Sequence, residues 1–82
     1  MNVTQEVVQL LDEVLSLNGR SFSFTRDTHL LGSIAELDSM AVVSLITGLE
    51  DRFNFVIDDS DIDGDVFATV GSLADFVAGK LA

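Results

Sequence analysis

Apolar residues recur at helical spacing close to the N-terminus of the chain. From Val3 to Leu17 they fall three or four positions apart, and acids and amides occupy most of the positions between them. Asn2 or Thr4 can cap the start of such a helix. The pair Asn18-Gly19 tolerates the left-handed conformation that ends helices. The pattern therefore predicts a helix over residues 3–17.

A second apolar run carries no charge between Asp38 and Glu50. Asp38 suits the N-cap position, and Leu37 just before it can pack against Val42 in the next turn. We expect a helix over residues 39–53, with Gly48 as a weak point that allows close packing. Its predicted inward stripe consists of Met40, Val43, Ile46 or Thr47, Leu49 and Phe53.

The rest of the chain has weaker periodicity. Residues 20–37 mix apolar and small polar side chains without a period, which predicts a long loop packed on the core. Residues 60–66 predict one short helix with Ile62 and Val66 inward, and a last helix opens at Thr69 or at 71–72 and ends near Leu81. The expected fold is all-α: a four-helix bundle of three longer helices and a short one, in a single domain over residues 1–82.

Charge and composition limit the classes of function that the chain can have. Fourteen acidic residues stand against four Lys and Arg, for a formal net charge of −10. Such a surface repels nucleic acid and anionic membranes and is steered toward basic patches on other proteins. The chain has no cysteine for thiol chemistry, no apolar stretch of about 20 residues, and no signal-peptide start. We expect a cytoplasmic protein without a membrane span, and a monomer.

Ser39 is the first candidate for chemistry, because it falls in the first turn of the second predicted helix. A serine there is ordinary as pure structure. A hydrolase nucleophile is disfavoured, since no Gly-x-Ser-x-Gly turn surrounds it and the single histidine, His29, lies in the long loop. Ser39 is better suited to be modified by another enzyme than to catalyse a reaction.

The acidic stretch of residues 58–65 offers a hypothesis from a different class, a small EF-hand-like calcium-binding protein. Val70 stands where the loop needs its bidentate glutamate, and no second loop is present to pair with it. We therefore expect no dedicated metal site, although weak binding of divalent cations is plausible at three carboxylates. These are Asp59, Asp61 and Asp63.

Three motifs in order resemble the acyl carrier protein family: residues 37–40 (Leu-Asp-Ser-Met), 49–53 (Leu-Glu-Asp-Arg-Phe) and 67–73. The resemblance covers nearly the whole chain. It implies that Ser39, with Asp38 as motif residue and cap, carries 4'-phosphopantetheine derived from coenzyme A. The arm would hold acyl groups as thioesters, and the protein itself would not be an enzyme. A helix N-terminus favours the phosphodiester at such a serine.

The implied partners are a phosphopantetheinyl transferase and acyl ligase, synthase or acyltransferase enzymes of fatty-acid, polyketide or specialised lipid synthesis. Carriers of fatty-acid synthesis usually bear acids early in the second helix, where this chain has Ala41 and Ser44, and Arg52 stands where an acid is common. This departure favours a specialised carrier, with a D-alanyl or aminoacyl carrier as the alternative. Charge near the site would come from Glu36, Asp38, Glu50 and Asp51. The residues expected to dock partners are Leu37, Met40, Val43, Ser44, Thr47, Glu50 and Asp51.

Overall fold

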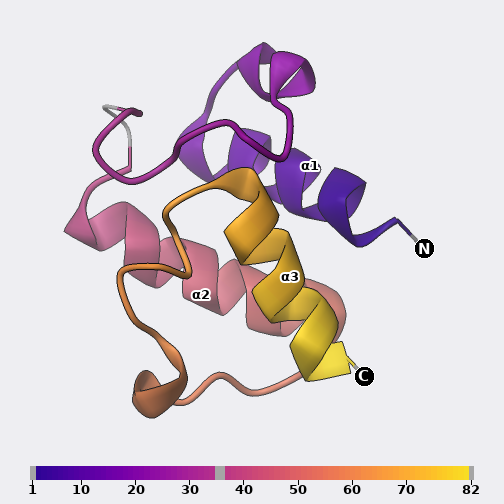
Figure 1. Ribbon diagram of the computed structural model, residues 1–82, viewed down its shortest axis with the longest axis vertical. Helices are drawn as coiled ribbons and strands as arrows, with labels where there is room; N and C mark the ends of the chain where they lie inside the picture. Colours follow the sequence, from indigo (N-terminus) through magenta and orange to yellow (C-terminus); the bar gives the residue numbers. More distant parts are fainter. Residues whose placement is uncertain (1, 35–36, 82) are drawn as a thin grey trace.

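Three α-helices form the framework of the described part of the protein (Figure 1). The computed structural model describes residues 2–34 and 37–81. The helices are α1 (Val3–Leu15), α2 (Ser39–Phe53) and α3 (Val70–Leu81), with 3-10 turns η1 (Arg20–Ser23) and η2 (Asp59–Asp61) in the connections. Within the described ranges, strand-type pairing is limited to one antiparallel bridge between His29 and Thr69. The predicted all-α fold is confirmed, and its short fourth helix is the single turn η2.

Helix α1 begins as predicted and ends earlier. The side chain of Asn2 accepts a hydrogen bond from the backbone N–H of Gln5, which caps the first turn. The helix stops at Leu15 because Ser16 takes a left-handed conformation (φ 55°), and the N–H of Leu17 then donates to the carbonyl of Asp12. The predicted end at Leu17 is therefore wrong by two residues. Leu17 has left the helix and is buried in the core.

Helix α2 has the predicted bounds, and only part of its predicted inward stripe is correct. Leu49 and Phe53 are buried, whereas Met40 and Val43 are 75% and 59% exposed, and Leu45 takes the inward place instead. The run is apolar almost all round, so its spacing alone does not distinguish the inner face from the outer one.

Helix α2 packs closely against α1 at Gly48. A Cβ at this position would lie 3.1 Å from Cδ1 of Leu10 and 3.6 Å from Cγ2 of Val14. The close packing expected at this glycine is confirmed.

The core lies between α1 and the other two helices, both of which pack against α1. Side chains from the connections complete it, which is how a chain of 82 residues encloses a continuous apolar centre. The buried apolar residues are Val7, Leu10, Leu11, Leu15, Leu17, Leu30, Leu37, Leu45, Leu49, Phe53, Ile57, Val66, Phe67, Val70, Leu73, Ala74 and Val77.

The long connection from α1 to α2 is held against the segment that leads into α3. The backbone N–H groups of Leu30 and Leu31 donate to the carbonyls of Ala68 and Phe67, at 2.9 and 3.0 Å. Leu30 is fully buried beneath this contact. Figure 1 shows the connection arching from the end of α1 to the start of α2. The expectation that this loop packs on the core is confirmed.

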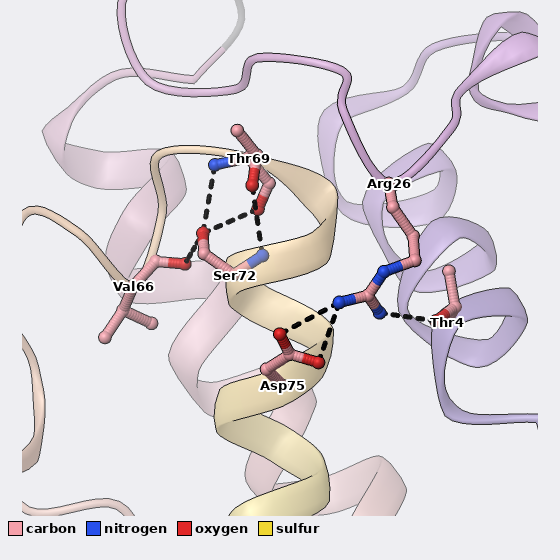
Figure 2. A network of polar contacts seen from close by, with 6 residues as sticks. All are labelled: Thr4, Arg26, Val66, Thr69, Ser72 and Asp75. Atoms are coloured by element: carbon pink, nitrogen blue, oxygen red, sulfur yellow. Dashed lines mark hydrogen bonds and ion pairs between the residues drawn. The ribbon is translucent and has the colours of Figure 1, made fainter.

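Helix α3 starts at a reciprocal cap. The hydroxyl of Thr69 accepts from the N–H of Ser72, and the hydroxyl of Ser72 accepts from the N–H of Thr69, both at 3.0 Å (Figure 2). This confirms Thr69 as the start signal. The helix predicted over 60–66 is replaced by η2 and a series of turns, although Val66 is buried and Ile62 is half-buried as expected.

Candidate functional site

Ser39 is the first residue of α2 and is exposed. Asp38 before it is the N-cap: its Oδ1 accepts from the N–H of Ala41 at 2.8 Å, and its carbonyl accepts from the N–H of Val42 at 3.0 Å. The cap fixes the backbone on both sides of the serine. The hydroxyl of Ser39 is thus presented to solvent from a rigid helix end, whose dipole favours a negative group there.

Leu37 anchors this junction from below. Its side chain is 5% exposed and belongs to the core, and its N–H donates to the carbonyl of Ile34 at 3.0 Å. The prediction that the side chain of Leu37 contacts partners is wrong, because this side chain is buried in the core. Its burial instead holds the segment before Ser39 in place.

The other predicted docking residues on the first half of α2 share one exposed strip. Met40 and Val43 are exposed apolar side chains, and Ser44 and Thr47 are exposed beside them. We call these four residues the α2 strip. It adjoins Ser39 and carries no charge, in a chain whose net charge is −10.

The two acids near the end of α2 differ in what they do. Glu50 is half-buried, and its Oε2 accepts from the backbone N–H of Ile57 at 2.8 Å, so it fastens the connection that follows α2. Asp51 is exposed. Glu36, also expected to supply charge near the serine, lies outside the described residues.

Arg52 serves the helix packing. Its Nε donates to Oε1 of Glu6 at 3.0 Å and its Nη2 to Oε1 of Gln9 at 2.9 Å, and Nη1 lies 3.4 Å from Oε2 of Glu13. All three partners belong to α1. The basic residue that replaces the expected acid therefore connects α1 to α2.

In the acidic stretch, a side chain proposed for cation binding already has a partner. Asp61 accepts from Nζ of Lys80 at 2.6 Å, and this hydrogen bond, together with that from the backbone of Asp58, lowers the pKa of Asp61. The Oδ1 of Asp63 accepts from the backbone N–H groups of Asp65 and Val66. The side chain of Asp59 lies outside the described residues.

No three acidic, histidine or cysteine side chains converge as a metal-binding group anywhere in the part of the chain that is described. The stretch also lacks a helix that leads directly into an EF-hand loop, because α2 ends at Phe53 and residues 54–58 separate it from Asp59. Weak binding of divalent cations there stays a prediction.

Two charged side chains that hold the fold together, Asp12 and Arg26, have no clear signal in the sequence. Asp12 accepts from the N–H of Gly19 and from the hydroxyl of Ser21, a fully buried polar side chain. Arg26 reaches Asp75 of α3 and Thr4 of α1 (Figure 2). In the sequence, Asp12 and Arg26 resemble ordinary surface charges, because their partners are distant along the chain or belong to the loop backbone.

Comparison with known proteins agrees with this geometry. A family model described as the phosphopantetheine attachment site matches residues 5–77. The solution NMR structure of a holo acyl carrier protein from Nitrosomonas europaea superposes with a TM-score of 0.92 and 48% sequence identity, over 99% of this chain and 98% of that chain. No curated relative matches the sequence.

The chain belongs to the acyl carrier protein family, the proteins that bear a phosphopantetheine attachment site. The prosthetic group of this family is 4'-phosphopantetheine, and its members are carriers and not enzymes. No helix in the described residues is long and apolar enough to cross a membrane.

Proposed function

We propose that Ser39 carries the 4'-phosphopantetheine arm and that residues 1–82 form one carrier domain around it. The observation that carries this proposal is the position of Ser39, exposed at the first residue of α2 directly after the capping Asp38. In loading, the hydroxyl oxygen of Ser39 would bond to the phosphorus that bears pantetheine while the diphosphate P–O bond of coenzyme A breaks. The nucleotide half leaves with the bridging oxygen, and the serine proton passes to a base of the transferase or to solvent. The thiol of the arm supplies the acyl-bearing sulfur that a chain without cysteine lacks.

The residues around Ser39 fit this role. The first turn of α2 directs backbone N–H groups and the positive end of its dipole toward the phosphodiester. The buried Leu37 and the Asp38 cap keep the attachment point fixed while the arm moves. An exposed and rigid base allows one arm to reach several partner enzymes in turn.

We further propose that partners bind over the α2 strip. Such partners present an apolar centre to Met40 and Val43 and basic groups to Asp38 and Asp51, which are both exposed. Apolar contact governs how long the complex lasts, and charge governs how fast it forms. The half-buried Glu50, bonded to the chain itself, contributes less to this rim than Asp51.

The cargo proposed is an acyl group of fatty-acid, polyketide or specialised lipid synthesis, handled by a dedicated ligase, synthase or acyltransferase. The uncharged strip supports a specialised carrier, because a general carrier of fatty-acid synthesis would bear acids there. A D-alanyl or aminoacyl cargo is the alternative, because the sequence Leu37-Asp38-Ser39-Met40 also resembles that of D-alanyl carriers. A cytoplasmic location and a monomeric state stay predictions.

Peptide mapping tests the attachment site. The purified chain is incubated with a phosphopantetheinyl transferase and coenzyme A, then digested and sequenced by mass spectrometry. The expected result is one added arm, on the peptide that contains Ser39. An arm on any other residue, or none at all, would overturn the proposal.

A further inference from the structure

The acidic stretch of residues 58–65 is fixed to the helices at both of its ends. Before it, the N–H of Ile57 donates to Oε2 of Glu50 in α2 at 2.8 Å. After it, the carbonyl of Val66 accepts from the hydroxyl of Ser72 in α3 at 3.0 Å. In Figure 1 the connection between α2 and α3 runs outside the helices, with η2 in its outer bend. The part between the two anchors can therefore open and close with a stability of its own.

The described backbone hydrogen bonds of the acidic stretch are local. The N–H of Asp61 donates to the carbonyl of Asp58 at 2.9 Å, and the N–H of Asp58 donates to Oδ2 of Asp61 at 3.0 Å. Among the described contacts, two side chains link the middle of the stretch to the rest of the protein. Ile62 is half-buried against the core, and Asp61 accepts from Nζ of Lys80 in the last turn of α3 at 2.6 Å. In the described residues, one ion pair is thus the polar link between this part of the connection and α3.

The charges of the acidic stretch work against its closed position. The stretch contains five aspartates and no basic residue, in a chain of net charge −10. Carboxylates this close along the chain repel one another, and a Debye length of about 8 Å at physiological salt screens them only in part. The side chains of Lys80 and Asp61 are 28% and 31% exposed, so their attraction is less screened than that of a surface pair. One partly buried ion pair therefore has to offset the repulsion within the stretch.

We propose that the Lys80–Asp61 ion pair is a charge-controlled latch on the acidic stretch. While the pair is formed, the stretch lies against the core at Ile62. When Lys80 loses its charge, repulsion among the carboxylates raises the population of a locally open form of the stretch. The three helices keep their packing in this form, because both anchors of the stretch hold. The latch is a conformational device of the connection and is independent of the proposed carrier function.

Three variants of the full chain test the latch. Lys80→Gln removes the positive charge and keeps a long side chain. Arg26→Gln is the matched control, because it also removes one positive charge from an ion pair with α3, that with Asp75, and leaves the acidic stretch untouched. Lys80→Gln combined with Asp65→Asn restores the wild-type net charge of −10, because it removes one exposed carboxylate of the stretch.

The measurement is amide hydrogen exchange followed by NMR, at low ionic strength and at several urea concentrations below the unfolding transition. The N–H groups of Asp61 and Val66 report on the stretch, and that of Leu11, in the middle of α1, reports on unfolding of the whole protein. We expect the stretch to exchange by local opening, whose rate depends little on urea, and to exchange about threefold faster in Lys80→Gln than in the wild type. This increase should shrink as salt screens the charges. The control variant should leave exchange of the stretch unchanged, and the double variant should exchange more slowly than Lys80→Gln.

Equal exchange rates of the stretch in Lys80→Gln and Arg26→Gln would overturn the inference. So would the same urea dependence at Asp61 and Leu11, because the stretch would then open only when the whole protein unfolds. An increase in Lys80→Gln that neither added salt nor Asp65→Asn reduces would also overturn it, since contact and not charge would then hold the stretch closed.

Discussion

The N–H of Gly71 donates to the carbonyl oxygen of Arg26 at 2.8 Å, so the start of α3 and the long loop touch backbone to backbone. A Cβ on residue 71 would lie 2.9 Å from that same oxygen. Because the oxygen belongs to the main chain, it cannot move aside as the end of a flexible side chain does. The contact holds the part of the long loop around Arg26 against the start of α3.

We expect Gly71→Ala to destabilise the protein by about 1–3 kcal/mol, through the steric conflict with Arg26. Gly79→Ala is the control, because Gly79 is in the same helix and a Cβ there would meet nothing within 4 Å. That variant should be neutral or gain up to about 1 kcal/mol. Urea denaturation measures both. A Gly71→Ala variant as stable as Gly79→Ala would show that the loop yields easily.

Arg52 should matter more for stability than Arg26, although both pair with carboxylates. The side chain of Arg52 is 25% exposed among its α1 partners, whereas the Arg26–Asp75 pair is 52% and 69% exposed. We expect Arg52→Gln to lower the free energy of unfolding by about 1–2 kcal/mol, and Arg26→Gln by less than about 1 kcal/mol. Urea midpoints measured at low and high salt show which of the two variants loses more stability. Equal losses of unfolding free energy would mean that the contacts of Arg52 with α1 contribute no more than an exposed ion pair.

The contact between Asp61 and Lys80 should make stability depend on pH in the acid range. The pKa of Asp61 is lowered in the folded protein by the hydrogen bonds from Lys80 and the Asp58 backbone. Its contribution is therefore present above the pKa of an unfolded aspartate, about 4, and is lost as the pH falls through the lower folded value. The difference in urea midpoint between wild type and Lys80→Met should be largest near pH 7 and should shrink below about pH 4. A difference that stays constant with pH would contradict this assignment.

If partners dock over the α2 strip, substitutions at Met40 and at Asp51 should change different rate constants of binding. Met40→Ala should weaken transfer to a cognate enzyme by faster dissociation, with little dependence on salt, because the lost contact is apolar. Asp51→Lys should slow association, most strongly at low ionic strength, where charges are screened least. Stopped-flow binding separates the two rates. If Met40→Ala has no effect and Asp51→Lys abolishes binding at every salt concentration, ion pairs dominate and the apolar strip is not the contact.

Local signals in the sequence were sufficient for the helix starts. The caps at Asn2, Asp38 and Thr69 are all observed, because a cap depends on residues three positions apart and on little else. The position of Ser39 at the start of α2 follows from the same signal. The end of α1 was less predictable, since Ser16, an ordinary helix surface residue, takes the left-handed conformation before Asn18.

Features that depend on distant partners could not be predicted. The α2 run is apolar on most sides, so only the packing against α1 decides that Leu45 is buried and Met40 is not. In the sequence, Glu50 and Arg52 resemble the solvent-exposed charged end of a helix. In the structure, Glu50 bonds to the connection that follows α2, and Arg52 bonds to α1. The backbone pairing of the long loop with residues 67–71 likewise leaves no periodic trace in the sequence.

The central claim, that Ser39 alone bears the arm, is tested most directly by intact-mass measurement of three chains after incubation with transferase and coenzyme A. The wild type and Ser60→Ala, whose exposed serine lies in η2 and outside the α2 strip, should each gain the mass of one phosphopantetheine. Ser39→Ala should gain none and should melt with the wild type, since an exposed serine at this position contributes little to stability. Modification of Ser39→Ala, or loss of modification in Ser60→Ala alone, would contradict the account.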